Sequence, residues 1–134
     1  MPPLRTFIVE DSPVILENLV DMLEELTPVK VIGSAPDEQG AVSWLSDGQQ
    51  GCDLLIIDIF LKGGSGLGVL RAAAQSGRHI KRVVLTNYAT PDMRRRCDEL
   101  GADRVFDKSS ELENLIEYCD EIGKDDEPTP DASG

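Results

Sequence analysis

Three carboxylates, one threonine and one lysine stand where they could share one piece of chemistry. Glu10 and Asp11 follow the apolar stretch LRTFIV, Asp58 closes LLIID, Thr86 closes KRVVLT, and Lys108 follows DRVFD. Clustered carboxylates repel one another unless a cation lies among them, and hard oxygen ligands suit Mg²⁺. A lysine ammonium and a threonine hydroxyl supply a charge and a hydrogen-bond donor for anionic oxygens. These residue types are suited to phosphoryl transfer onto a carboxylate.

Asp58 ends a run of apolar residues that has no polar alternation. A solid block such as residues 54–57 is typical of a strand buried on both faces of a parallel sheet. A charge that emerges from such a strand is costly to bury unless something pairs with it. We therefore expect Asp58 to find a partner among the residues at the ends of the other strands.

Five strand-then-helix units are predicted by the alternation of apolar and amphipathic stretches. The strands are expected at residues 4–9, 29–35, 54–58, 81–86 and 103–107, and the helices at residues 12–26, 37–47, 66–77, 91–101 and 110–123. This alternation predicts an α/β fold, a doubly wound (βα)5 sandwich of the flavodoxin type, with a five-stranded parallel sheet and helices on both faces. Because ligands of such sheets bind at the carboxyl ends of the strands, the candidate residues would meet at one edge.

Local signals refine several elements. The first helix is expected to have Ser12 as its N-cap and Pro13 as its first residue. Its apolar residues recur at helical spacing, at Ile15, Leu19, Met22 and Leu26. Trp44 in the second helix is interpreted as a core residue, and His79 as a surface residue.

Two further patterns have both a structural and a functional interpretation. The stretch GGSG, residues 63–66, follows the third strand, whereas phosphate-binding loops of this architecture follow the first strand, so a flexible turn is favoured. Arg94, Arg95 and Arg96 form a dense basic cluster. A solvated helix face is favoured for them, with binding of an acidic partner as the alternative.

Length and charge limit the classes of function. The 134 residues suit one domain, expected over residues 1–123, with a disordered acidic tail over residues 124–134. The net charge of −12 disfavours binding to nucleic acid or to an anionic membrane and favours a cation or a basic protein. Cys52, Cys97 and Cys119 lack metal-ligand spacing, so buried thiols in a reducing compartment are expected. No apolar run reaches the roughly 20 residues of a membrane helix, and a cytoplasmic location is expected.

At its strand ends the sequence resembles the receiver domain of two-component response regulators, which has a CheY-like fold. The match covers residues 4 to about 122 and consists of Glu10-Asp11 after the first strand, Asp58 in LLIIDIF, Gly66 in the loop behind it, Thr86 in VVLTN and Lys108 in GADRVFDKS. The resemblance implies that a histidine kinase or phosphotransfer protein donates a phosphoryl group to Asp58. It implies a signalling module and not an enzyme, although the module would catalyse its own phosphorylation and dephosphorylation.

The resemblance also implies a role for each residue of the set. Asp11, Asp58 and the backbone carbonyl of Phe60 would ligate Mg²⁺, with Glu10 acting through a metal-bound water. Thr86 would turn toward the phosphoryl oxygens and Lys108 would pair with them. The module would act on a downstream protein that the sequence does not identify, as a monomer or weak homodimer.

Three positions depart from the family pattern. Lys62 stands where a proline is usual after the aspartate, and Ser109 replaces the proline that commonly follows the lysine, which excludes a cis proline bond there. Val105 occupies the place of the usual aromatic residue, with Phe106 next to it. The resemblance implies an aromatic ring at this position that swings inward in concert with the threonine. A valine here weakens that expected coupling.

Two other classes of function stay open. An aspartate-nucleophile phosphatase or mutase needs a second aspartate two residues after the nucleophile, where this chain has Phe60. An unphosphorylated receiver-like interaction domain typically lacks an acidic or lysine residue of the set, and this chain has them all. Residues 124–134 are too few to fold alone, so we expect either a stand-alone regulator or a receiver excised from a longer chain.

Overall fold

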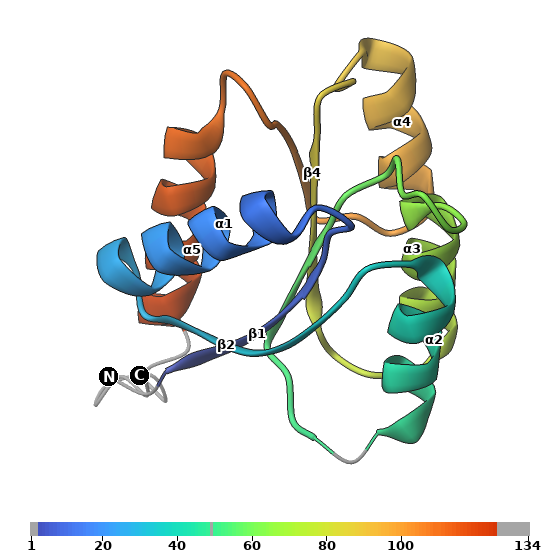
Figure 1. Ribbon diagram of the computed structural model, residues 1–134, viewed down its shortest axis with the longest axis horizontal. Helices are drawn as coiled ribbons and strands as arrows, with labels where there is room; N and C mark the ends of the chain where they lie inside the picture. The colour runs from blue at the N-terminus through green and yellow to red at the C-terminus, as the bar shows by residue number, and fades with distance from the viewer. Residues whose placement is uncertain (1–2, 49, 126–134) are drawn as a thin grey trace, which may run out of the picture.

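Five parallel strands form a single sheet in the computed structural model, which describes residues 3–48 and 50–125 (Figure 1). The strands are β1 (Leu4–Val9), β2 (Val29–Ala35), β3 (Leu54–Ile57), β4 (Lys81–Thr86) and β5 (Arg104–Asp107), in the spatial order β2-β1-β3-β4-β5. The helices are α1 (Pro13–Leu26), α2 (Glu38–Asp47), α3 (Gly66–Gln75), α4 (Pro91–Glu99) and α5 (Leu112–Asp125). The predicted doubly wound (βα)5 fold is confirmed.

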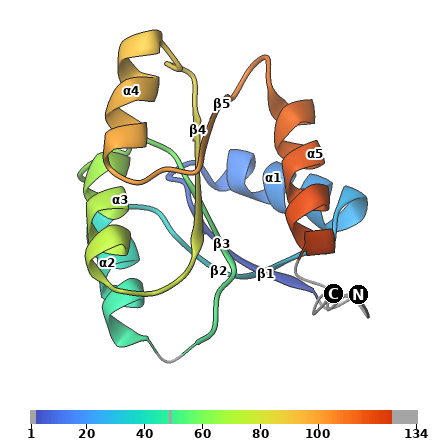
Figure 2. The same ribbon diagram turned by 180° about the vertical axis from the view of Figure 1, so that it is seen from behind.

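The helices cover both faces of the sheet, with α1 and α5 on one face and α2, α3 and α4 on the other (Figure 1 and Figure 2). Alternate residues of β3 enter the two layers. Leu54 and Ile56 pack with α1 and α5, whereas Leu55 and Ile57 pack with the other three helices. All four side chains are buried. Burial on both faces explains why the run has no polar alternation before Asp58.

Helices α1 and α4 each begin at a side-chain N-cap that is followed by a proline. The Ser12 hydroxyl accepts a hydrogen bond from the backbone N–H of Ile15 at 3.3 Å, and Pro13 is the first residue of α1. Thr90 caps α4 in the same way through the N–H of Met93 at 3.1 Å. The caps satisfy N–H groups that have no partner within the helix.

The start of α5 differs from the expectation. The helix begins at Leu112 and not at residue 110, because the Asp107 carboxylate accepts hydrogen bonds from the N–H groups of Ser109 and Ser110 and holds them in a turn. It continues to Asp125, two residues into the predicted tail. The remainder of that tail lies outside the described residues.

The apolar face of α1 also differs from the predicted one. Leu19 and Leu23 are buried against the sheet and α5. Ile15 and Leu26 are exposed. Successive helical residues are about 100° apart, so the tilt of α1 on the sheet decides which of several neighbouring apolar residues is buried.

The cysteines, Trp44 and His79 lie in the environments that the sequence predicts. The three cysteines are free and buried, and burial raises the pKa of the Cys119 thiol to about 12. Trp44 packs on the core with its ring stacked on Phe7, the two centroids 4.0 Å apart. His79 is exposed. Within the described ranges, none of the helices has the length and apolar character needed to cross a bilayer.

Candidate functional site

The hydrogen-bond ladder of the sheet continues past the strand ends and positions the candidate residues. The N–H of Asp58 donates to the carbonyl of Val9 at 3.0 Å. The N–H of Glu10 donates to the carbonyl of Ala35, the last residue of β2, also at 3.0 Å. The N–H of Lys108 donates to the carbonyl of Thr86 at 2.8 Å. These bonds fix the neighbouring chain segments relative to one another, so the candidate residues leave the sheet at one edge.

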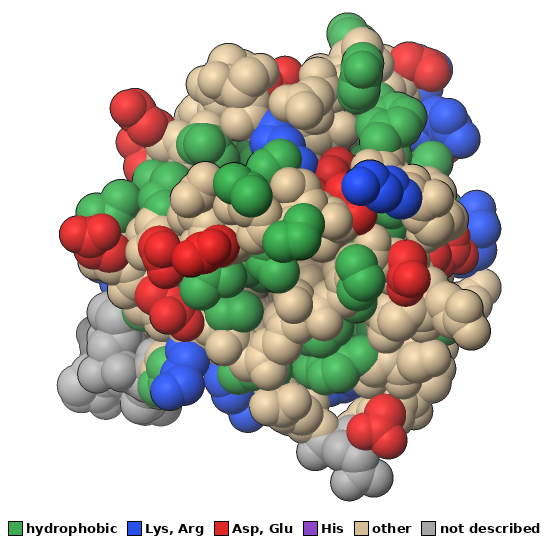
Figure 3. Space-filling view, in the orientation of Figure 1, with side chains coloured by type: hydrophobic (Ala, Val, Ile, Leu, Met, Phe, Trp, Pro, Cys, Tyr) green, Lys and Arg blue, Asp and Glu red, His purple; other side chains and the backbone are tan. Residues whose placement is uncertain are grey.

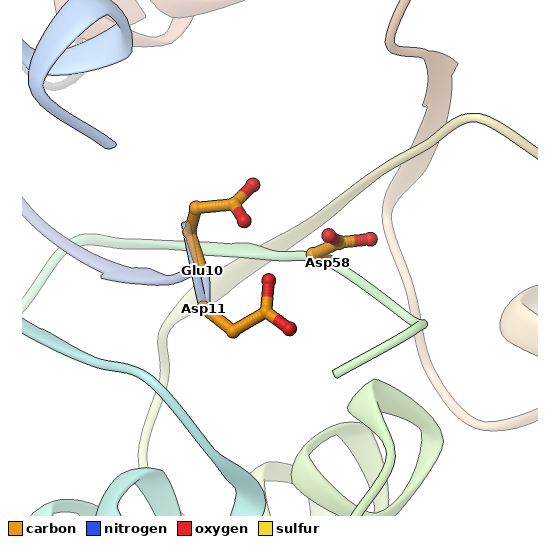
Figure 4. Close-up of side chains that lie close together, drawn as sticks. All are labelled: Glu10, Asp11 and Asp58. Atoms are coloured by element: carbon orange, nitrogen blue, oxygen red, sulfur yellow. The ribbon is translucent and has the colours of Figure 1, made fainter. Parts of the chain in front are cut away.

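The carboxylates of Glu10, Asp11 and Asp58 converge at this edge, as Figure 4 shows. One oxygen atom from each carboxylate lies within 4.8 Å of the others. The side chain of Glu10 is 3% exposed and that of Asp58 is 12% exposed, so neither charge is fully hydrated. Charges at this depth destabilise a fold unless they are paired, and the cluster therefore needs a cation.

Lys108 supplies a positive charge to two of these carboxylates. Its Nζ lies 2.5 Å from Glu10 Oε1 and 3.0 Å from Asp58 Oδ2, and its side chain is 11% exposed. Burial alone would lower the pKa of Lys108, but the hydrogen bonds and charges of Glu10 and Asp58 outweigh it, so the pKa lies above its ordinary value. Lys108 is thus a permanent cation at neutral pH, and it is the partner that the sequence required for Asp58.

Backbone N–H groups bind other carboxylate oxygens of the cluster. The N–H of Lys62 donates to Asp11 Oδ2 at 2.8 Å, and the N–H of Phe60 approaches Asp58 Oδ1 at 3.4 Å. Both donors belong to the loop between β3 and α3. A proline at position 62 would have no N–H for Asp11, so this departure from the family pattern adds a contact between the loop and the cluster.

Thr86 lies at the end of β4, next to β3 in the sheet, and its side chain is fully buried. Its hydroxyl oxygen accepts a hydrogen bond from the N–H of Tyr88 at 3.2 Å and keeps its own hydrogen for donation. The Tyr88 ring packs edge-on against the Phe60 ring, with centroids 4.8 Å apart. Both rings are exposed, Phe60 by 52% and Tyr88 by 60%, so an aromatic pair joins the loops after β3 and β4.

Gly66 is required by the close approach of α3 to Asp58. A Cβ atom at Gly66 would lie 2.8 Å from the Cα of Ile59 and would overlap the backbone carbonyl of Asp58. The N–H of Gly66 donates to the carbonyl of Ile59 at 2.9 Å. No physical reason for a glycine here could be seen in the sequence, since the crowding arises from residues seven and eight positions earlier.

Arg94 makes the most extensive contact that sequence reasoning missed. Its guanidinium donates to the carbonyl of Ala89 at 2.9 Å, the carbonyl of Val105 at 2.8 Å and the Glu111 carboxylate at 2.6 Å. The Arg94 hydrogen bond holds the pKa of Glu111 below its ordinary value. Arg94 therefore ties the loop after β4 to β5 and to the start of α5. It does not belong to the purely solvated face that the arginine cluster suggested.

Phe106 does not take over the place of the missing aromatic residue. Its side chain is buried in the layer formed by α1 and α5. The half-buried Val105 packs on the opposite layer with α4. Adjacent strand residues point to opposite faces, so a ring at position 106 lies on the wrong side of the sheet to replace one at position 105.

The donor set of the cluster fits Mg²⁺. The three groups are hard oxygen donors within 4.8 Å of one another, and they carry three negative charges against the single charge of Lys108. Mg²⁺ keeps several waters and binds proteins through one or two carboxylates. The partly exposed Asp11 and Asp58 leave room for such waters.

Comparisons with known proteins point to one family. A family profile described as the response regulator receiver domain matches residues 6–120. The nitrate/nitrite response regulator protein NarP of Escherichia coli strain K12 is 29% identical over 116 residues, which are 86% of this chain and 53% of NarP. The chain spans about half the length of the curated relatives it matches.

Solved structures show the same fold. A LuxR-family two-component response regulator from Aurantimonas sp. SI85-9A1 superimposes with a TM-score of 0.81 at 21% identity, covering 98% of this chain and 93% of that one. A chain of the CheX–CheY–BeF3–Mg²⁺ complex from Borrelia burgdorferi gives a TM-score of 0.80 at 16% identity, covering 91% and 90%.

Proposed function

The chain belongs to the family of response regulator receiver domains, and from this membership we propose that it accepts a phosphoryl group on Asp58. The observation that carries the proposal is the position of Asp58 between Lys108 and the acidic pair Glu10-Asp11. A carboxylate held this way has a fixed cation beside it and two neighbouring carboxylates for a metal ion. Positioning and charge neutralisation are most of what phosphoryl transfer requires.

In the proposed reaction a carboxylate oxygen of Asp58 forms a bond to the phosphorus of a phosphohistidine. The bond from that phosphorus to the histidine nitrogen breaks, and its electron pair leaves with the imidazole. Lys108 remains charged and pairs with the added phosphoryl oxygens, while the Thr86 hydroxyl donates a hydrogen bond to them. Bound Mg²⁺ would neutralise charge on the phosphoryl group. Asp11, Asp58 and the Phe60 carbonyl would ligate the metal ion, with Glu10 acting through a metal-bound water.

The implied donor is a histidine kinase or a phosphotransfer protein, and the implied target is a protein that recognises a changed surface. We propose that the module works in the cytoplasm as a monomer or weak homodimer. A phosphatase is disfavoured because the exposed Phe60 ring stands where that class needs an acidic general acid. An unphosphorylated interaction domain would not need all of the acidic residues together with Lys108.

Incubation with acetyl phosphate and Mg²⁺, followed by intact mass measurement, tests the proposal. A single phosphate adduct should form in the presence of Mg²⁺ and should be lost after treatment with a chelator. An unmodified mass under conditions that phosphorylate a known receiver domain would reject the phosphoacceptor role.

The response to phosphorylation should concentrate in α4, β5 and α5. Thr86 and Lys108 lead directly into these elements, and Arg94 ties them together. Amide hydrogen exchange should therefore change more over residues 91–125 than over residues 12–26 when the phosphorylated and free proteins are compared. Larger changes in α1 would contradict this placement of the output surface.

Asp11→Ala should weaken Mg²⁺ binding by roughly tenfold or more, since even outer-shell partners of a metal are worth at least that. Calorimetric titration of the unphosphorylated protein measures the effect. Asp47→Ala is the matched control, because Asp47 is an exposed carboxylate at the end of α2. Undiminished affinity in Asp11→Ala would remove Asp11 from the ligand set.

The phosphoryl group should persist longer in this chain than in a variant with polar residues beside Asp58. Hydrolysis needs a water in line with the phosphorus, and the paired rings of Phe60 and Tyr88 stand on the loops that border the site. Apolar rings do not orient a water, whereas amide and carboxylate groups do. The double variant Phe60→Asn with Tyr88→Glu should lose phosphate about tenfold faster, or about 1.4 kcal/mol of barrier.

Decay of the adduct in Mg²⁺ buffer, followed by intact mass, measures that rate. Leu26→Asn is the control, since it also replaces an exposed apolar residue, but at the far end of α1. Equal decay of wild type and double variant would show that the rings do not limit the approach of water.

A further inference from the structure

The loop between β3 and α3 is packed against the first turn of α2, and Glu38 makes the principal contact. The backbone N–H of Glu38 donates to the carbonyl of Gly63 at 3.0 Å, and its Oε1 accepts from the N–H of Ser65 at 2.9 Å. Glu38 is the first residue of α2, where the helix dipole favours a carboxylate. One residue thus binds two backbone groups of the loop.

The close approach to the start of α2 explains the glycines at positions 63, 64 and 68. A Cβ atom at Gly64 would lie 2.5 Å from the Cβ of Glu38, and one at Gly68 would overlap the Glu38 carboxylate. A Cβ atom at Gly63 would lie 3.1 Å from the Cβ of Asp37. Gly63 and Gly64 lie in the loop between β3 and α3, and the absence of side chains there lets the start of α2 approach closely.

The same loop carries backbone groups that contact the carboxylate cluster. Phe60 and Ser65 form an isolated antiparallel bridge, so the two ends of the loop are paired. Lys62 lies between them, and its N–H donates to Asp11. A displacement of Ser65 would therefore move Phe60, its partner in the bridge, and Lys62 as well.

We propose that Glu38 is a positioning residue for the metal site. It holds Gly63 and Ser65, and through them it fixes the loop that bears the Phe60 carbonyl and the Lys62 N–H. The inference rests on the proposed function in one respect, namely that the Phe60 carbonyl ligates Mg²⁺. Glu38 is not one of the clustered carboxylates, and it lies on α2, an element that the sequence did not connect with the site.

Two variants separate the hydrogen bond from the charge. Glu38→Ala removes the acceptor for Ser65, whereas Glu38→Gln keeps an oxygen at that position. Mg²⁺ affinity should fall about tenfold in Glu38→Ala and stay within about threefold of wild type in Glu38→Gln. Glu113→Ala is the matched control, because Glu113 is an exposed acid in the first turn of α5 and its loss removes the same charge from a helix start. Its affinity should equal that of wild type.

Hydrogen exchange in the metal-free protein provides the second measurement. The amides of Ser65 and Lys62 should exchange about tenfold faster in Glu38→Ala, and should keep wild-type rates in Glu38→Gln and Glu113→Ala. Wild-type protection of Lys62 in Glu38→Ala would overturn the proposal, as would equally weak Mg²⁺ binding by the Gln and Ala variants. If the wild-type protein itself binds no Mg²⁺, the proposed function fails, and the exchange rates still decide whether Glu38 fixes the loop.

Discussion

Asp58→Asn should accept no phosphoryl group while keeping the fold of the wild type. The amide has the shape of the carboxylate but lacks a nucleophilic oxygen anion, so the adduct should vanish completely in the intact mass spectrum. Mg²⁺ affinity should fall as well, because one of three clustered carboxylates is lost. A phosphate adduct on Asp58→Asn at the wild-type level would place the acceptor elsewhere.

The stability of Asp58→Asn should stay close to that of the wild type. The amide oxygen can still accept the hydrogen bond from Lys108, which retains Glu10 as its charged partner at 2.5 Å. Removing one negative charge from the cluster also reduces repulsion, so the free energy of unfolding should change by no more than about 1 kcal/mol. Asp53→Asn is the control, since it removes a carboxylate paired with Arg5 outside the cluster and should be phosphorylated like the wild type.

Gly66→Ala should be strongly destabilising and should also weaken the site. The new methyl group would overlap the carbonyl group of Asp58 and crowd the Cα of Ile59. These are backbone atoms, which cannot rotate away as a side chain could. Overpacking of this kind costs about 1–3 kcal/mol, and contact with fixed backbone atoms places Gly66→Ala toward the upper end of that range. Relief of the clash would move either α3 or Asp58, so Mg²⁺ affinity should fall together with the free energy of unfolding in urea.

Gly77→Ala separates crowding from backbone conformation. Gly77 has a φ of 74° and no atom within 4 Å of an added Cβ, so its substitution introduces only left-handed backbone strain. We expect a loss of about 1–2 kcal/mol in the free energy of unfolding and no change in Mg²⁺ affinity. A Gly66→Ala protein that resembled Gly77→Ala in both measurements would show that α3 does not press on Asp58.

The number and burial of the strands were predictable because their sequence signals are local. The block of residues 54–57 has no polar alternation, which indicates burial on both faces, and the structure buries all four residues. Parallel strands then bring their carboxyl ends to one edge whatever the details of packing. This is why Glu10, Asp58 and Lys108 could be expected to meet, and the structure does bring them together.

The contacts made by helices were less predictable because they depend on tertiary packing. Ile15 and Leu19 are both apolar, and only the tilt of α1 decides that Leu19 is buried while Ile15 is exposed. The sequence favoured a solvated face for Arg94 and gave no sign of a role for Glu38, since their partners are backbone groups of β5 and of the loop between β3 and α3, which carry no sequence signal. Helical spacing reveals a face but not which element covers it.

The position of β1 between β2 and β3 in the sheet has a consequence for synthesis on the ribosome. β1 pairs with β3, which follows about 50 residues later, and at about 5–20 residues per second β3 is made several seconds after β1. During that time the backbone N–H and C=O groups along one edge of β1 lack their strand partners. The first βα units of the nascent chain therefore remain open to chaperones and proteases until β3 has emerged.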